Sequence, residues 1–303
     1  MRKRLIAILL LLAIVLSGYG CSDSLGKSKL TITFIDVGQG DSALIECDNH
    51  FMLIDGGDTD AADEVRRVLE KNKVTKLDVL VASHLDKDHI GGLVEGLDGV
   101  RSIKHTLSNS KSASTKVFKE FQQRIQESGS QIKVPKIGAT YKLGRAEIQV
   151  IDVRDQKRND SLVLLVTYGN TTFLFAGDIE QDAQKRVADA LRSPELESKL
   201  KSSKNLIKMP HHGAYNSTKF NQNDISDNYL NTLLTACYAK YFLISVGKGN
   251  QHGHPHENTL TIINQVLRTH NLNPNEHFFR TDVNGDVVVE SDGENLTIKT
   301  TRN

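Results

Sequence analysis

Short apolar runs separated by polar, glycine-rich turns make up most of this chain. The runs are rich in β-branched residues, which is typical of strands, and we expect strands at residues 30–35, 42–46, 51–54, 79–82, 147–152, 162–168, 172–176, 205–208 and 241–246. A further β-like stretch, 283–300, contains a turn at Asp292-Gly293. Apolar residues recur with helical spacing at 61–71, after Gly91, at 181–191 and at 258–269. Strands interleaved with helices predict mixed sheets whose outer faces are covered by helices.

The first 29 residues have a different pattern. Three basic residues, Arg2-Lys3-Arg4, precede an apolar run over 5–16, which is shorter than the about 20 residues that span a bilayer core. This pattern predicts a signal peptide over 1–20. The small residues before Cys21 resemble a bacterial lipoprotein signal, so we expect a lipidated Cys21, a tether over 21–29 and a folded domain over 30–303 on the extracytoplasmic face of the membrane. Simple cleavage and an uncleaved anchor are the alternatives.

Composition is that of a folded domain with a sizeable core. The chain has 303 residues, of which 38% are hydrophobic and 25% charged, and it shows no internal repeat. Only Cys47 and Cys237 follow Cys21, which excludes a disulfide framework. Without the three basic residues near the N-terminus, 35 Lys and Arg face 37 Asp and Glu, so overall charge favours no particular partner.

The distribution of charge is less even than its total. Residues 101–145 contain ten Lys or Arg but only two acidic residues, Glu120 and Glu127. Phe118, Phe121 and Tyr141 lie among these charges, a mixture that occurs in surfaces that bind nucleic acids. The same residues fit a solvated basic patch above the core face of a helix, and the sequence leaves both readings open.

The densest chemistry follows the apolar run 77–82. His84, Asp86, Asp88 and His89 place four potential metal ligands within six residues, directly after a predicted strand. Loops after strand ends are places where imidazoles and carboxylates from one segment can converge. Imidazole and carboxylate groups are the nitrogen and oxygen ligands of zinc and manganese sites. The segment therefore predicts a metal site.

Further polar motifs follow other predicted strands. They are Asp36 to Ser42 (DVGQGDS), Asp55-Gly56-Gly57, Asn159-Asp160-Ser161, Gly177-Asp178, Pro210 to Gly213 (PHHG) and His252 to His256 (HGHPH). Together with SHLDKDHIGG over 83–92 they resemble, in order, the metallo-β-lactamase superfamily, and within it the hydrolase domain of ComEC-type competence proteins. The resemblance extends over about 30–271. It implies an α/β (α+β) fold, a four-layer αββα sandwich with a binuclear metal site at one edge of its sheets.

The resemblance also implies a ligand set. His84 and Asp86 would hold one metal ion, Asp88 and His89 a second, and Asp178 would bridge the two. Asp86 replaces the superfamily's usual histidine, and this hard oxygen ligand shifts the preference from Zn²⁺ toward Mn²⁺. The superfamily's third histidine is replaced near 159–161, which leaves the first ion more open to water. The last ligand is His211, His212 or His254; we take His211 as the ligand and give the other two catalytic roles.

The remaining candidate residues would act on or contact the substrate, or orient the metal ligands. Asp88 would orient the attacking water, while His212 or His254 would neutralise the phosphate or protonate the leaving oxygen. Asp55 would orient a ligating histidine from behind. The expected substrate contacts are Asp41, Asn159, Ser161 and Ser217, with Asn216 beside the last. Simpler structural readings exist for Asp178 as a helix N-cap, for the glycines as turn residues and for His252, His254 and His256 as surface histidines.

The chemistry and the resemblance lead to a functional hypothesis. We expect an exported, lipid-anchored phosphodiesterase with two divalent ions, Zn²⁺ or Mn²⁺, acting as a nuclease on single-stranded or degraded DNA. The partners are then nucleic acid and, through the anchor, the membrane; no protein partner is indicated. The alternatives are hydrolysis of another ester, a lactone or a cell-wall phosphodiester, and a surface binding protein without turnover. The intact set of ligands argues against the binding protein.

Overall fold

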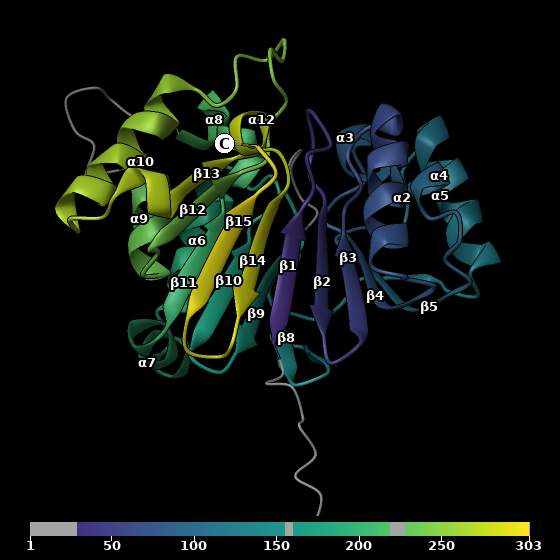
Figure 1. Cartoon of the computed structure of the whole chain (residues 1–303), viewed down its shortest axis with the longest axis horizontal. Coiled ribbons are helices and arrows are strands. Elements are labelled where there is room, and N and C mark those ends of the chain that lie inside the picture. Colours follow the sequence, from purple (N-terminus) through teal and green to yellow (C-terminus); the bar gives the residue numbers. More distant parts are fainter. Residues whose placement is uncertain (1–28, 155–159, 219–227, 303) are drawn as a thin grey trace, which may run out of the picture.

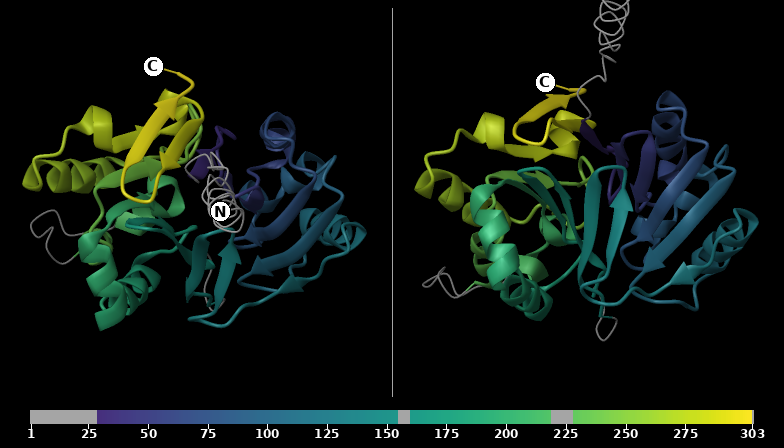
Figure 2. Two further views of the ribbon diagram at one scale, coloured as in Figure 1. Left: turned by 60° about the horizontal axis from the view of Figure 1, so that its bottom comes forward. Right: turned by 90° about the horizontal axis from the view of Figure 1, so that it is seen from below.

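Two mixed β-sheets pack face to face, and helices cover both outer faces (Figure 1). The computed structural model describes residues 29–154, 160–218 and 228–302. Within these residues the first sheet has the strand order β15-β14-β1-β2-β3-β4-β5-β6 and the second the order β13-β12-β11-β10-β9-β8-β7. Figure 2 shows the same layers from two other directions, with the helices on the outside. The predicted four-layer αββα sandwich is confirmed.

Most strands lie where the pattern of apolar residues predicts them. The first sheet contains β1 (Leu30–Phe34), β2 (Ala43–Cys47), β3 (His50–Ile54), β4 (Lys76–Ala82), β5 (Ser102–Ser108), β6 (Ile132–Lys133), β14 (Val287–Ser291) and β15 (Leu296–Thr300). The second contains β7 (Thr140–Leu143), β8 (Ala146–Asp152), β9 (Val163–Tyr168), β10 (Thr171–Phe175), β11 (Lys204–Lys208), β12 (Tyr241–Ile244) and β13 (Phe278–Arg280).

Helices flank the sheets or follow strand ends. Those on the side of the first sheet are α2 (Ala62–Lys71), α3 (Lys87–Ile90), α4 (Leu93–Gly96) and α5 (Lys116–Glu127), after the 3₁₀ turn η2 (Thr59–Ala61). Those on the side of the second are α6 (Gln181–Leu191), α7 (Pro194–Ser202), α8 (Tyr215–Thr218), α9 (Tyr229–Ala236), α10 (Glu257–Thr269), α11 (Pro274–His277) and α12 (Thr281–Asn284), with the 3₁₀ turn η3 (Pro210–Gly213). No helix among the described residues is long and apolar enough to cross a membrane.

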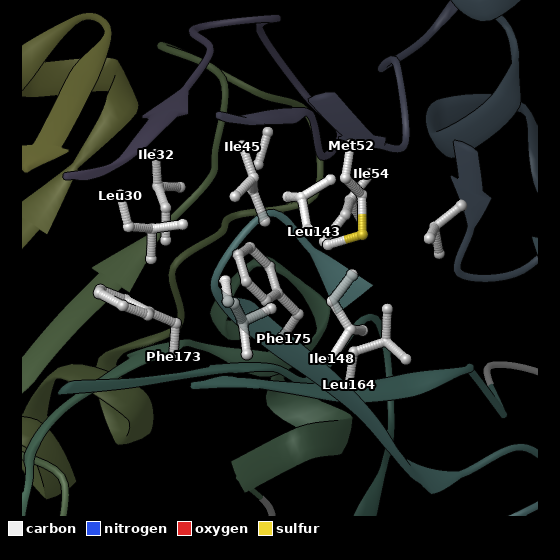
Figure 3. Packing of buried hydrophobic residues seen from close by; sticks show 14 of the residues in the cluster. Leu30, Ile32, Ile45, Met52, Ile54, Leu143, Ile148, Leu164, Phe173 and Phe175 are labelled. Carbon is white, nitrogen blue, oxygen red and sulfur yellow. The ribbon is translucent and has the colours of Figure 1, made fainter. Parts of the chain in front are cut away.

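Apolar side chains from both sheets fill the space between them. Ile32 and Phe34 of the first sheet and Phe173 and Phe175 of the second are almost fully buried, and the rings of Phe34 and Phe175 stack with centroids 5.7 Å apart. Figure 3 shows the two sets of side chains pointing toward one another across this core. Burial of this surface is the main favourable contribution to the fold, and it fixes how the two sheets face each other.

The structure also contains elements that the sequence pattern did not predict. Strand β5, helix α7 and helix α9 were missed, and α12 occupies part of the stretch 283–300 that was expected to be β-like. Phe118 and Phe121 lie on the buried face of α5, so the core reading of these two aromatic residues is right. The predicted signal peptide 1–20 and Cys21 lie outside the described residues.

One edge of the sandwich collects the polar motifs. Strands β3 and β4 are parallel, as are β10, β11 and β12, so their carboxyl ends lie on a common side within each sheet. The short helices α3 and α8, which follow β4 and β11, both lie at the upper edge in Figure 1. Loops that are far apart in the sequence therefore meet at this edge.

Candidate metal centre

Asp178 lies at the centre of a cluster of histidines. Its Oδ2 atom is 3.3 Å from Nε2 of His89, 3.6 Å from Nε2 of His212, 3.8 Å from Nε2 of His211 and 3.9 Å from Nε2 of His84. The helix α6 is capped at Glu180, so Asp178 is not its N-cap. Four imidazoles from two loops, one after β4 and one after β11, thus surround a single carboxylate.

Unusual backbone conformations aim these side chains. Gly177 has φ of 53°, and a Cβ atom there would lie 2.5 Å from Cβ of Ser161, so only glycine fits before Asp178. His211 and His212 have φ of 48° and 51°, values that non-glycine residues rarely adopt. Such conformations persist where the surrounding structure enforces them, and they cluster at functional sites. Here they turn both imidazoles of the η3 turn toward Asp178.

The buried donor atoms fit a divalent cation. Asp88, His89, Asp178 and His212 each offer one ligand atom, and these atoms lie within 4.8 Å of one another. Among the buried side-chain atoms that make no hydrogen bond within the described residues, four belong to this cluster: Nε2 of His84, His89 and His212 and Oδ1 of Asp178. Buried polar atoms without partners are costly, and a cation would satisfy all four. The mixture of imidazole nitrogen and carboxylate oxygen suits Zn²⁺ or Mn²⁺.

Two of the histidines are oriented from behind by carboxylates. Nδ1 of His89 lies 2.9 Å from Oδ2 of Asp55. The same Oδ2 accepts a hydrogen bond from the hydroxyl of Ser83, and Oδ1 accepts one from the backbone N–H of Ser83. Nδ1 of His212 lies 3.0 Å from the carbonyl of Ser245 and 3.3 Å from Oδ1 of Asp41. With the proton held at Nδ1, the lone pair at Nε2 points at the cluster, as in many metal sites.

The His84 side of the cluster is held differently. Nδ1 of His84 lies 3.2 Å from the hydroxyl of Ser83 and 3.5 Å from that of Ser161. Nε2 of His84 is 3.9 Å from Oδ2 of Asp86, whose side chain is 52% exposed. Ser161 therefore lies beside His84, in the segment 159–161 where the resemblance implied that another residue replaces the superfamily's third histidine. Its hydroxyl accepts a hydrogen bond from the backbone N–H of Asp178.

The pKa values of the histidines also differ between the His212 side and the His84 side of the cluster. Burial lowers the pKa of His212, but the carboxylates of Asp178 and Asp41 outweigh it and raise the pKa to about 9. Burial together with the charge of His89 lowers the pKa of His84 to about 4. For Asp178, burial acts to raise the pKa, but His89 and His212 hold it well below its usual range. Without a cation, protons on the His212 side balance the buried carboxylates.

Lys208 is a buried residue of this site that the sequence analysis missed. It ends β11, is 3% exposed, forms an ion pair with Asp41 and donates a hydrogen bond to the carbonyl of Gly177 at 3.3 Å. A lysine in an apolar strand next to PHHG was the available signal, because lysine is rarely buried without a partner. Lys208 thus joins the loop of Asp41 to the residue before Asp178.

A cavity of about 660 Å³ opens over the cluster, a size that holds a small ligand. Its lining includes Asp86, Asp88, Asp178, His211, His212 and His254, together with Gln39, Lys87, Tyr215 and Asn216. Asp41, Ser161 and Ser217 do not line it, and each is at most 5% exposed. The structure thus places these three predicted substrate contacts beneath the cavity surface, where each makes internal hydrogen bonds or ion pairs. Asn159 lies outside the described residues.

The late histidines separate into different roles. His212, to which the sequence analysis gave a catalytic role, contributes Nε2 to the four-residue cluster. His211, taken there as the ligand, faces Asp178 on one side and Glu180, 3.3 Å from its Nδ1, on the other. His256 caps α10 by accepting from the backbone N–H of Asn258, which is a structural role. The two adjacent histidines were indistinguishable in sequence, and in the structure both face Asp178, with Nε2 of His212 at 3.6 Å and Nε2 of His211 at 3.8 Å from its Oδ2.

The basic segment 101–145 does not surround the cavity. None of its residues is among those that line it. Arg145 pairs with Asp48 in the turn between β2 and β3, at the opposite end of these strands from Asp41 and Asp55, and Lys142 pairs with Glu147. Arg124 donates to the backbone carbonyls of Leu97 and Val100. The basic segment therefore lies apart from the cavity, and its reading as a polyanion-binding face stays a prediction.

Comparisons with known proteins agree with the geometry. The chain is 26% identical over 291 residues to ComE operon protein 3 of Bacillus subtilis strain 168, covering 89% of this chain and 33% of that protein. The chain thus spans about a third of the length of this curated relative. No family model matches the chain.

Solved structures support the fold. The metallo-β-lactamase fold protein YhfI of Bacillus subtilis aligns with a TM-score of 0.52 at 12% identity, covering 86% of this chain and all of YhfI. A variant of the β-hydroxylase CmlA, an enzyme of Streptomyces venezuelae, aligns with a TM-score of 0.51 at 12% identity, covering 86% of this chain and 53% of CmlA. The resemblance inferred from the motifs is confirmed: the chain has the metallo-β-lactamase fold and is similar in sequence to ComE operon protein 3.

Proposed function

We propose that this protein is a metal-dependent phosphodiesterase. The observation that carries the proposal is the arrangement around Asp178, where four imidazole nitrogens lie within 3.3 to 3.9 Å of one carboxylate oxygen at the base of an open cavity. Asp88, His89, Asp178 and His212 would hold one divalent ion, and His84 and Asp86 a second with Asp178 between them. Divalent ions in such a site supply Lewis acidity and a water that ionises near neutral pH.

The side chains around the cluster have separate tasks. Asp88 lines the cavity, and although burial acts to raise its pKa, the contact with His212 and the charge of His89 hold the pKa well below its usual range. An ionised Asp88 accepts a hydrogen bond and can orient a water for attack on phosphorus. Asp55, through His89, and Asp41, through His212, keep the ligands fixed while the phosphate is bound.

His254 is placed to hold a phosphate oxygen. The backbone N–H of Gly247 donates to Oε1 of Gln39, which leaves Nε2 of Gln39 to donate to Nδ1 of His254 at 3.3 Å. His254 is neutral at pH 7 because burial, His212 and His211 lower its pKa to about 4. Its single N–H is therefore at Nε2, a hydrogen-bond donor for the phosphate. Because the imidazolium form of His254 is scarce at pH 7, this residue carries no acidic proton to donate, and protonation of the leaving oxygen falls to water.

The wider setting follows from the sequence. The resemblance to ComEC-type domains and to ComE operon protein 3 supports nucleic acid as the phosphodiester, and the pattern of residues 1–29 supports export and a lipid anchor at Cys21. We therefore propose a nuclease on the extracytoplasmic face of the membrane. Because acidic side chains line the cavity, we expect a phosphodiester to bind there when metal ions compensate its negative charge.

The test is hydrolysis by the full-length protein of bis-p-nitrophenyl phosphate and of single-stranded DNA, each with Mn²⁺, with Zn²⁺ and with a chelator. We expect metal-dependent cleavage of both. Cleavage of neither by protein with bound metal would contradict the proposal and direct attention to lactones and cell-wall esters. Cleavage of the small ester but not of DNA would retain the phosphodiesterase and reject the nuclease.

A further inference from the structure

Tyr215 places an aromatic ring in the wall of the cavity, and this residue is not one of the candidate metal ligands. Its side chain lines the cavity, and the residue is 45% exposed. Among the large hydrophobic residues that are exposed in the described part of the chain, Tyr215 is the aromatic one. It lies three residues after His212, directly beyond the η3 turn that carries the ligand. Because this ring lies in the wall of the cavity and not in the core, it is available for contact with a ligand.

The ring of Tyr215 is held from one side. The ring of His256 meets it at 61° with centroids 4.9 Å apart, and the backbone N–H of His256 donates to the carbonyl of Gly213 at 2.8 Å. The following residue, Asn216, also lines the cavity, and its carbonyl accepts a hydrogen bond from Gln181. The ring is therefore held in place before a ligand binds, which lowers the entropy lost on binding.

The charges of the cavity show what Tyr215 would bind. Apart from imidazoles, the lining contains one cationic side chain, Lys87, and its Nζ pairs with Asp58 at 2.7 Å. Five acidic residues line the same cavity: Asp58, Asp86, Asp88, Asp178 and Glu180. Metal ions would compensate Asp86, Asp88 and Asp178, but apart from the imidazoles the described lining offers no unpaired cationic side chain to the phosphates that flank a scissile bond. Part of the affinity for a nucleic acid should therefore come from its bases. Stacking on an aromatic side chain is the interaction that every base can make.

We propose that Tyr215 is the stacking platform of a nucleobase subsite next to the scissile phosphate. The proposal rests on the phosphodiesterase function proposed above and specifies its substrate as a nucleotide ester with an unpaired base, recognised through the base and not through its neighbouring phosphates. A base within a duplex is stacked on its neighbours and cannot lie on the ring. Single-stranded ends and short oligonucleotides are therefore the expected substrates.

Two esters with the same leaving group test this subsite. The p-nitrophenyl ester of thymidine 5′-monophosphate carries a base, whereas methyl p-nitrophenyl phosphate does not. In the full-length protein with Mn²⁺ we expect kcat/KM to be about tenfold higher for the thymidine ester, within the range that one base–aromatic stack contributes. The ratio should fall to about one in Tyr215→Ala and persist in Tyr215→Phe. Ile137→Ala, which removes an exposed apolar side chain away from the cavity, is the matched control.

A binding measurement separates the subsite from the catalytic function. By titration calorimetry, thymidine 5′-monophosphate should bind about tenfold more tightly than methyl phosphate to the wild-type protein, and Tyr215→Ala should remove the difference. A base preference that survives Tyr215→Ala in both assays would overturn the subsite while leaving the phosphodiesterase intact. Tyr215-dependent binding of the nucleotide without hydrolysis of either ester would support the subsite and reject the catalytic proposal.

Discussion

The two sides of the metal cluster differ in what stands behind their ligands. On one side, His89 and His212 are backed by the carboxylates of Asp55 and Asp41 at 2.9 and 3.3 Å. On the other, His84 is backed by serine hydroxyls, and its neighbour Asp86 is half exposed. A carboxylate behind an imidazole makes it a stronger and better oriented ligand than a hydroxyl does. For the two-ion site proposed above, the difference predicts one tight metal position and one weaker, more open position.

The largest effect should come from the residue that both positions share. Asp178→Asn removes the charge that lies within 3.9 Å of four imidazoles, and we expect it to reduce turnover by more than the about 100-fold that losing an outer partner of a metal ligand can cost. Metal content measured by mass spectrometry should fall at both positions. Asp189→Asn, an exposed carboxylate of α6, is the control and should behave as wild type. One position that stays fully occupied in Asp178→Asn would mean that Asp178 does not bridge.

The next largest effect should distinguish the two proposed metal positions by their metal affinities. His212→Ala removes a ligand from the tight position and should lower the affinity for the first metal equivalent, measured by competition with a chromophoric chelator. His84→Ala should leave that first equivalent largely in place and weaken the second. Equal losses in the two variants would contradict the division into a tight and a weak position.

The outer partners should show the same asymmetry on a smaller scale. Asp55→Asn keeps the shape behind His89 but removes the charge, and we expect a loss of metal affinity of about 10- to 100-fold. Ser83→Ala removes a neutral hydroxyl that lies 3.2 Å from Nδ1 of both His84 and His89 and donates to Asp55, and it should cost less than Asp55→Asn. Both proteins should be compared by thermal unfolding without metal, so that a loss of folding is not taken for a loss of ligand orientation. A larger effect of Ser83→Ala would reverse the comparison.

Protons should compete with metal on one side only. The raised pKa of His212, about 9, means that this imidazole is protonated at pH 7 and must lose its proton to become a ligand. Metal affinity at the tight position should therefore rise with pH up to about 9, by about tenfold per unit for each proton released. His84, with a pKa of about 4, is already neutral at pH 6 and adds no such dependence. Calorimetry in buffers of different ionisation enthalpy counts the released protons, and none released would contradict this assignment.

Much of this architecture is local enough to be predicted from the sequence. The runs of β-branched residues fixed nine strands in order because each run is bounded by turn residues, and the spacing of His84 to His89 marked the metal loop. Strand β5 was missed because Lys104 and His105 interrupt its apolar pattern; in the folded protein these two positions are exposed or half-buried while Ile103 and Leu107 face the core.

The rest depended on contacts between distant segments. Asp41 and Ser161 were expected to touch substrate, but Asp41 is paired with Lys208, 167 residues later, and Ser161 holds the backbone of Asp178. The orientation of the His211 and His212 rings toward Asp178 depended on two positive φ angles within one turn. Neither kind of information is present in the local pattern, because tertiary packing decides which polar groups become buried.

The pairing of β1 with β14 has a consequence for how the chain reaches its native state. Ile32 lies opposite Val289, so the first strand of the domain obtains one of its two neighbours only from residues near the other end of the sequence. Closing so long a loop is slow, and until it closes the apolar edge of β1 is open to pairing with other chains. As the protein is synthesised, the first sheet therefore stays incomplete until β14 and β15 emerge, and the nascent domain is most prone to aggregate just before they do.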